Sequence, residues 1–182
     1  MANENIKIED NFLEQEEFDL LRVTMTGDNF PWFFRYRYYA LEETRENHSR
    51  GNELDKFQFT HIFYDSQVVN SGNFKILSPI LHKLDSFSMQ KIRANLHTRL
   101  PTLIENTFHT DMDNLPEEKL KQWITSIFYV NTNDGYTVFE DGTKVESVAN
   151  RMLTFPANMK HTGTSCTDKQ TRIVINFNYY KK

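Results

Sequence analysis

The sequence predicts a mainly β protein in which a sandwich or barrel of short strands carries helices on its outside. Short β-rich segments follow one another in the second half of the chain, and turn residues such as Asp141-Gly142 separate several of them. In the first half, two segments instead place apolar residues at helical spacing. No Gly/Ser/Pro-rich linker or internal repeat divides the 182 residues, so we expect a single domain spanning residues 1–182.

Two helices are expected in the first half. In residues 11–25, Phe18, Leu21 and Met25 recur at helical spacing, which predicts an amphipathic helix that ends near Gly27. A second helix is predicted from a similar apolar period, which comprises Leu77, Ile80, Leu81, Leu84 and Phe87. Ser78 is expected to be its N-cap, with Pro79 in its first turn.

Strands are expected on either side of a long polar segment. Residues 30–41 are rich in β-formers and predict a strand with Trp32, Phe34 and Tyr36 in the core. An alternative is that the arginines and aromatic rings of this segment bind a nucleic-acid strand. Residues 42–56 are too long and charged for a tight turn, and predict either a solvated loop or a substrate lid. Residues 57–64 resume a strand pattern, in which His61 is expected to be structural.

Six more strands are expected, over residues 92–97, 107–111, 124–131, 136–139, 151–155 and 172–180. The last of these alternates between two faces, because successive side chains of a strand point to opposite sides of a sheet. One face is apolar and the other carries Arg172, Val174, Asn176 and Asn178. This polar face looks either at water or, as we expect, into the interior of a barrel.

Composition excludes several classes of protein. The chain has 25 acidic and 21 basic side chains and a net charge of −4, which argues against a broad nucleic-acid or anionic-membrane footprint. No apolar run approaches the roughly 20 residues that span a bilayer. Residues 1–10 lack the apolar core of a signal peptide. Cys166 is the only cysteine, so there is no internal disulfide and we expect a reducing cytoplasm.

The sequence offers one candidate metal site. His109 and Asp111 stand at i and i+2, which in a strand places an imidazole and a carboxylate on the same face. His161 is a candidate third ligand. Two imidazoles and one carboxylate on one face of an octahedral ion leave three positions open, as in non-heme Fe(II) oxygenases, although zinc hydrolases use similar ligands. The alternative is a surface strand pair and an unrelated loop histidine.

A candidate anion-binding residue follows the third histidine. Arg172 stands eleven positions after His161 and opens the last predicted strand. Its planar guanidinium can bind a carboxylate through two hydrogen bonds. A dicarboxylate that chelated a metal at one end would need such an anchor at the other.

Taken in order, these motifs resemble a known family. His109-x-Asp111 is followed by ITSIFYVN, DGYTVFEDG and RMLTFP, and then by His161 and Arg172. The assembly covers roughly residues 92–180 and resembles Fe(II)- and 2-oxoglutarate-dependent oxygenases of the prolyl 4-hydroxylase-like branch, especially small members encoded by bacteriophages. The resemblance implies a double-stranded β-helix (jelly-roll or cupin-like) core over residues 91–182, supported by the helices and strands of residues 1–90.

The resemblance also implies the roles of individual residues. His109, Asp111 and His161 would bind Fe(II), and 2-oxoglutarate and dioxygen would be the co-substrates. Ascorbate is a possible further cofactor. The residues implied in 2-oxoglutarate binding are Arg172, Tyr129 and Asn176. A further contact would come from the strand before His109, where His97 or Asn95 stands at the position of a Tyr in many relatives. Tyr136 replaces the second residue of a usual Gly-Gly pair, which adds a large side chain near the expected site.

The reaction implied is hydroxylation of a C–H bond with release of succinate and CO2. A peptidyl or amino-acid substrate, with prolyl residues first, is expected. The expected partner is therefore a peptide, a protein or a small molecule, and no membrane is expected. The expected location is the cytoplasm, or the host cytoplasm if a virus encodes the chain. The oligomeric state is left open. Three alternatives remain: a nucleic-acid demethylase of the same family, a zinc hydrolase that uses the same triad, and a barrel that binds a ligand without catalysis.

Overall fold

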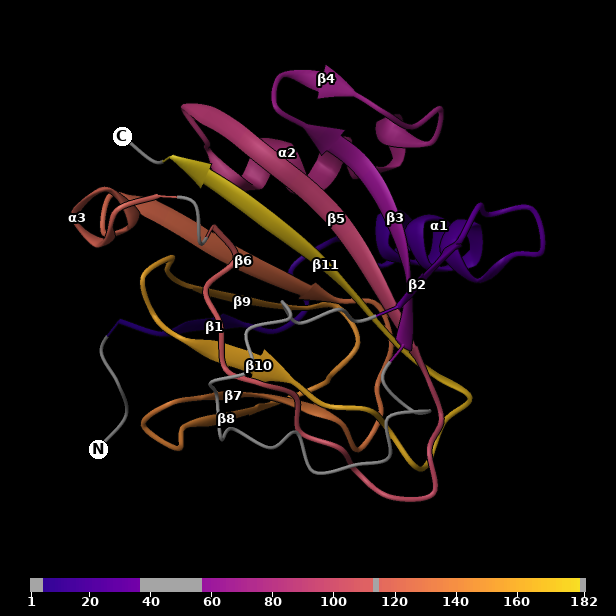
Figure 1. Ribbon diagram of the computed structural model, residues 1–182. Helices are drawn as coiled ribbons and strands as arrows, with labels where there is room; N and C mark the ends of the chain where they lie inside the picture. Colours follow the sequence, from indigo (N-terminus) through magenta and orange to yellow (C-terminus); the bar gives the residue numbers. More distant parts are fainter. Residues whose placement is uncertain (1–4, 37–56, 113–114, 181–182) are drawn as a thin grey trace.

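The computed structural model describes residues 5–36, 57–112 and 115–180, and it is mainly β (Figure 1). The segment 42–56, predicted as a loop or lid, and residues 37–41 lie outside the described residues. The helical elements are α1 (Gln15–Thr26), the 3-10 helix η2 (Phe74–Leu77), α2 (Ser78–Leu84) and α3 (Glu117–Leu120). The strands are β1 (Lys7–Glu9), β2 (Phe33–Tyr36), β3 (Phe57–Asp65), β4 (Val68–Val69), β5 (Ser88–Thr98), β6 (Trp123–Tyr129), β7 (Tyr136–Phe139), β8 (Lys144–Glu146), β9 (Arg151–Pro156), β10 (His161–Gly163) and β11 (Thr171–Tyr180).

The strands form two antiparallel sheets. The larger has eight strands in the order β1-β9-β6-β11-β5-β3-β2, with β4 paired to β3. The smaller has three strands in the order β10-β7-β8. In Figure 1 the small sheet lies below the large one, and α1 and α2 lie behind the large sheet. The predicted sandwich with helices on its outside is therefore confirmed.

Two apolar clusters hold these layers together. The first joins Phe18 and Leu21 of α1 and Ile80 of α2 to one face of the large sheet. The second lies between the two sheets, where Phe139 of β7 packs with Phe155 of β9. No described helix is long and apolar enough to cross a bilayer.

β11 occupies the middle of the large sheet, between β6 and β5, and its two faces serve different layers. Ile173, Ile175, Phe177 and Tyr179 all belong to the cluster beneath the helices. The opposite face carries Arg172, Asn176 and Asn178, which are buried. The prediction that this polar face looks into the interior is confirmed, because the small sheet covers it.

Two predicted elements near the metal-site candidates differ from the structure. Residues 107–111 do not form a strand, since only His109 is bridged, to His161. His161, which follows the predicted strand 151–155 and belongs to no predicted strand, opens β10. Neither could be inferred locally, because His109 is bridged to a residue 52 positions later and β10 pairs with β7, 22 to 26 positions earlier.

Three smaller expectations are also wrong. Ser78 is the first residue of α2 rather than its N-cap, a position that Leu77 occupies, although Pro79 lies in the first turn as predicted. Phe87 lies beyond the helix and is exposed. Phe34 and Tyr36 are exposed as well, because β2 is the edge strand of the large sheet.

His61 in β3 is structural, as predicted, and it makes stability depend on pH. Its Nδ1 lies 2.7 Å from the Pro31 carbonyl oxygen and its Nε2 2.7 Å from Ser71 Oγ. Burial lowers the pKa of His61, although the bond to Pro31 opposes this shift. The folded state therefore binds this proton more weakly than the unfolded state does.

We therefore expect the free energy of unfolding to decrease as pH falls below about 6.5, the ordinary histidine value, at up to about 1.4 kcal/mol per pH unit for this group. Chemical unfolding between pH 7.5 and 5 measures the dependence. His61→Gln should flatten it, and an equal slope in this variant would contradict the assignment.

Candidate metal centre

The structure brings His109, Asp111 and His161 together at one end of the space between the sheets. His109 lies in the segment before α3, and its backbone exchanges two hydrogen bonds of 3.0 Å with that of His161 at the start of β10. One potential ligand atom from each of the three side chains lies within 4.8 Å of the others. Asp111 converges with His109 although the segment is not a strand.

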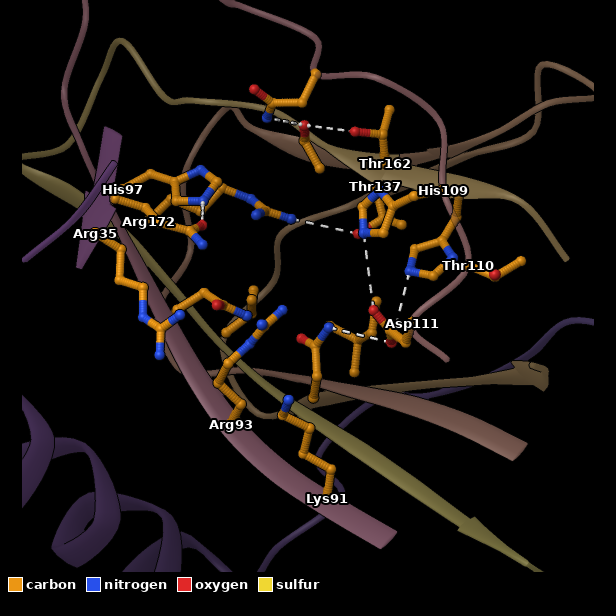
Figure 2. Close-up of a pocket in the computed structure, with 18 of the residues that line it drawn as sticks. Arg35, Lys91, Arg93, His97, His109, Thr110, Asp111, Thr137, Thr162 and Arg172 are labelled. Atoms are coloured by element: carbon orange, nitrogen blue, oxygen red, sulfur yellow. Dashed lines mark hydrogen bonds and ion pairs between the residues drawn. The ribbon is translucent and has the colours of Figure 1, made fainter. Parts of the chain in front are cut away.

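Backbone carbonyl groups orient both imidazole rings. His109 donates from Nδ1 to the carbonyl of Thr107 at 3.1 Å, and His161 donates from Nδ1 to that of Met159 at 3.2 Å. Each Nε2 is thus left for Asp111, at 3.8 Å from His109 and 3.9 Å from His161 (Figure 2). Metal-binding histidines are commonly held in this way, with the second nitrogen bound to an acceptor.

Asp111 is a buried carboxylate that lacks one partner. Asn178 donates to its Oδ2 at 3.1 Å and Asn176 at 3.4 Å, whereas its buried Oδ1 accepts no hydrogen bond from any described residue. A buried charged oxygen without a partner is costly unless a cation compensates it. The site therefore fits a divalent metal ion.

The electrostatics of the triad favour the protonation states that bind metal. Burial alone would raise the pKa of Asp111, but the neighbouring His161, His109 and Arg93 hold it below its ordinary value. Burial lowers the pKa of His161, an effect that Asp111 opposes and His109 reinforces. An ionised carboxylate beside a neutral imidazole is the form that a metal ion requires.

Arg172 lies in the same cavity, which has a volume of about 580 Å³. Its Nε donates to Ser147 Oγ at 2.8 Å and its Nη2 to Thr137 Oγ1 at 3.3 Å. Arg172 is only 2% exposed, and its side chain points from β11 toward the interior (Figure 2). The cavity thus presents the triad and a fixed guanidinium to a single small molecule.

Of the other three predicted co-substrate residues, His97 and Asn176 line this cavity, whereas Tyr129 only contacts residues that line it. Tyr129 lies beneath Arg172, donates to Thr137 Oγ1 at 2.8 Å and stays un-ionised because burial raises its pKa. His97 lines the cavity and bonds to Gln58 and to the Thr164 carbonyl. Asn176 also lines it, next to Asp111. Asn95, the alternative to His97, lines the cavity too.

Gly135 gives Arg172 its space. A Cβ at this position would lie 2.7 Å from Arg172 Cδ and 2.6 Å from the Ser165 carbonyl oxygen. Tyr136, expected to intrude on the site, instead donates to Glu105 and does not line the cavity.

We expect Gly135→Ala to displace Arg172 and to destabilise the protein by about 1–3 kcal/mol, the usual cost of overpacking. Urea unfolding measures the change, and Gly72→Ala, where a Cβ would meet nothing, is the matched control. Equal stability of the two variants would show that Arg172 does not need this space.

Several residues that line the cavity or hold Arg172 in place were not singled out from the sequence. Ser147 and Thr137 hold Arg172 through hydrogen bonds that span 25 and 35 residues, which no local pattern shows. Lys91 and Arg93 line the cavity from β5. The alternation of polar residues along this strand was the available signal, because it places them on the same face as His97.

Comparisons with known proteins bear on the fold. No protein-family model and no curated protein matches the chain. A solved prolyl hydroxylase from Trichoplax adhaerens, in complex with a hypoxia inducible factor peptide fragment, has a TM-score of 0.61 at 14% identity, covering 97% of this chain and 84% of that one. A viral collagen prolyl hydroxylase from Paramecium Bursaria Chlorella virus-1 has a TM-score of 0.56 at 12% identity, covering 98% and 91%.

A third solved structure is HygX from Streptomyces hygroscopicus, with nickel, 2-oxoglutarate and hygromycin B bound. It has a TM-score of 0.60 at 9% identity, covering 98% of this chain and 83% of that one. At such identities the likeness establishes the fold alone. The predicted double-stranded β-helix core is confirmed.

Proposed function

We propose that this chain, which has the fold of the Fe(II)- and 2-oxoglutarate-dependent oxygenases, is itself a dioxygenase that hydroxylates a C–H bond. The observation that carries the proposal is the presence of His109, Asp111 and His161 in one cavity with the buried Arg172. The resemblance of the motifs and the shared fold support it. A zinc hydrolase could use the same triad, but it would not need the guanidinium.

The residues divide into a metal-binding set and a co-substrate set. His109, Asp111 and His161 would hold Fe(II) and leave three positions open. When bound, the iron supplies dioxygen activation coupled to decarboxylation of 2-oxoglutarate to succinate and CO2. Arg172 would pair with the distal carboxylate of 2-oxoglutarate, and Ser147 would fix the guanidinium. The neutral phenol of Tyr129 would hold Thr137 in place through its hydrogen bond to Thr137 Oγ1, the same oxygen that Arg172 contacts.

The substrate we propose is a peptidyl or amino-acid side chain. The fold shared with prolyl hydroxylases, one of them solved with a peptide fragment, supports this choice. A reducing cytoplasm, as the single cysteine predicts, suits a site that must keep iron ferrous, and ascorbate would serve the same purpose.

Anaerobic titration with Fe(II) and 2-oxoglutarate tests the proposal. We expect a metal-to-ligand absorption band that requires both additions, followed by succinate release when oxygen is admitted. Assaying succinate release against peptide, amino-acid and oligonucleotide pools then identifies the substrate class. Absence of the band would contradict the proposed function, and stimulation by oligonucleotides alone would favour a nucleic-acid demethylase.

A further inference from the structure

Three cationic side chains line the same cavity on the side formed by β2 and β5. Arg35 comes from β2, and Lys91 and Arg93 come from β5. Figure 2 shows the three side chains along one side of the cavity, away from His109. We refer to Arg35, Lys91 and Arg93 as the basic wall.

The basic wall has little counter-charge among the residues that the structure describes. Asp111 is the only acidic residue of the described cavity lining. Lys91 forms an ion pair with Asp65 at 3.5 Å. Neither Arg35 nor Arg93 forms an ion pair with a described residue, and the buried Nε of Arg93 donates no hydrogen bond to one. A buried donor of this kind is unfavourable until a ligand supplies an acceptor.

Composition does not explain this concentration of positive charge. The whole chain carries a net charge of −4, whereas the described lining of the cavity has four cationic residues and one acidic residue. Only Ile127 and Val174 are aliphatic among the described lining residues. The basic wall is therefore suited to binding an anionic group. An uncharged substrate side chain, such as a prolyl ring, would not interact with its charges.

This inference rests on the function proposed above. In that function, neither the metal nor 2-oxoglutarate binds to the basic wall. Arg172 would be neutralised by the distal carboxylate of 2-oxoglutarate. The charge of the metal would be balanced by Asp111 and by the other carboxylate of the co-substrate. Arg35 and Arg93 would keep their charge. Arg93 is half-buried, so electrostatic attraction at this residue is stronger than in bulk water, whereas Arg35 is exposed.

We propose that the substrate carries a carboxylate or phosphate group that binds to the basic wall. Arg93 and Arg35 offer planar guanidinium groups that can each bind such an anion through two hydrogen bonds, and Lys91 adds a point charge. Because Arg93 and Asp111 line the same cavity, an anion held at Arg93 places the rest of the substrate beside the metal site.

The sharpest test follows the Arg93 Nε–Hε group itself by nuclear magnetic resonance of the ¹⁵N-labelled protein. The probes are phenyl phosphate and benzoate, with benzamide as the neutral analogue. We expect at least one of the two anions to shift the Arg93 resonance in a saturable way, and benzamide to leave it unchanged. The anion that binds more tightly identifies the group as phosphate or carboxylate.

A charge-matched pair of variants assigns the binding to the basic wall. Because Arg93→Gln lacks the Arg93 Nε–Hε reporter group, anion binding to the variants is measured by isothermal titration calorimetry. Arg93→Gln should weaken this binding by at least about tenfold, because charge-assisted hydrogen bonds are lost. Arg22→Gln removes the same charge from the exposed face of α1 and should leave binding unchanged. The inference is wrong if neither anion shifts the Arg93 resonance, or if the two variants weaken binding equally.

Affinity for 2-oxoglutarate separates this inference from the proposed function. With Fe(II) at saturation, the anaerobic absorption titration should give the same affinity for 2-oxoglutarate in Arg93→Gln as in the unaltered protein. If the variant loses this affinity, Arg93 belongs to the co-substrate site and the inference is wrong. If the unaltered protein shows no absorption band but binds anions at Arg93, the proposed function fails while the anion site stands.

Discussion

Asp111→Ala is expected to abolish iron binding and, with it, all succinate formation. Among the residues that the structure describes, Asp111 contributes the only carboxylate within ligand distance of the two imidazoles. Replacing a residue that merely supports a metal ligand costs about 10- to 100-fold in affinity, so loss of a ligand should lower Fe(II) affinity by at least about 100-fold. Anaerobic titration of the absorption band at saturating 2-oxoglutarate measures the loss.

Two controls make this result specific. Asp19→Ala removes a carboxylate from the exposed face of α1, where it pairs with Arg22, and should leave Fe(II) affinity unchanged. Circular dichroism of Asp111→Ala should show that the sheets are retained. A folded Asp111→Ala protein that kept the full absorption band would contradict the assignment of this residue as a ligand.

Much of the fold could be predicted because its signals are local. The alternation along β11 identified its apolar and polar faces, since the side-chain period of a strand is two residues. The helical spacing of Phe18, Leu21 and Met25 identified α1 for a similar reason. β10 and the bridge between His109 and His161 are set by long-range pairing. A three-residue strand offers too few positions for any pattern.

In the candidate site, too, the residues with a local sequence signal could be predicted and those that depend on long-range contacts could not. Residue type, order and spacing were enough to nominate the triad and Arg172, and the structure places all four around one cavity. The supports of these residues were not predictable, because Ser147, Thr137 and the backbone carbonyls have no distinctive sequence signal. Arg93 could have been nominated from the polar face of β5, yet its lack of an ionic partner among the described residues appears only in three dimensions.

Arg172→Gln is expected to weaken 2-oxoglutarate binding strongly while leaving Fe(II) binding nearly unchanged. Loss of one partner from a buried, hydrogen-bonded charge pair costs about 2–4 kcal/mol, which corresponds to roughly 30- to 700-fold in affinity. Fe(II) affinity should change by less than about threefold, since Arg172 is not among the residues that converge as metal ligands. Separate anaerobic titrations of metal and co-substrate measure the two effects.

Graded variants distinguish binding by Arg172 from a general disturbance of the core. Arg172→Lys keeps the charge but loses the planar fork, so its affinity for 2-oxoglutarate should be intermediate. Ser147→Ala removes only the hydrogen bond to Nε and should cost about 1 kcal/mol, or roughly fivefold. Equal losses of iron and 2-oxoglutarate affinity in Arg172→Gln would mean that the arginine supports the fold rather than the co-substrate. A selective and graded loss requires direct contact between the guanidinium and the distal carboxylate.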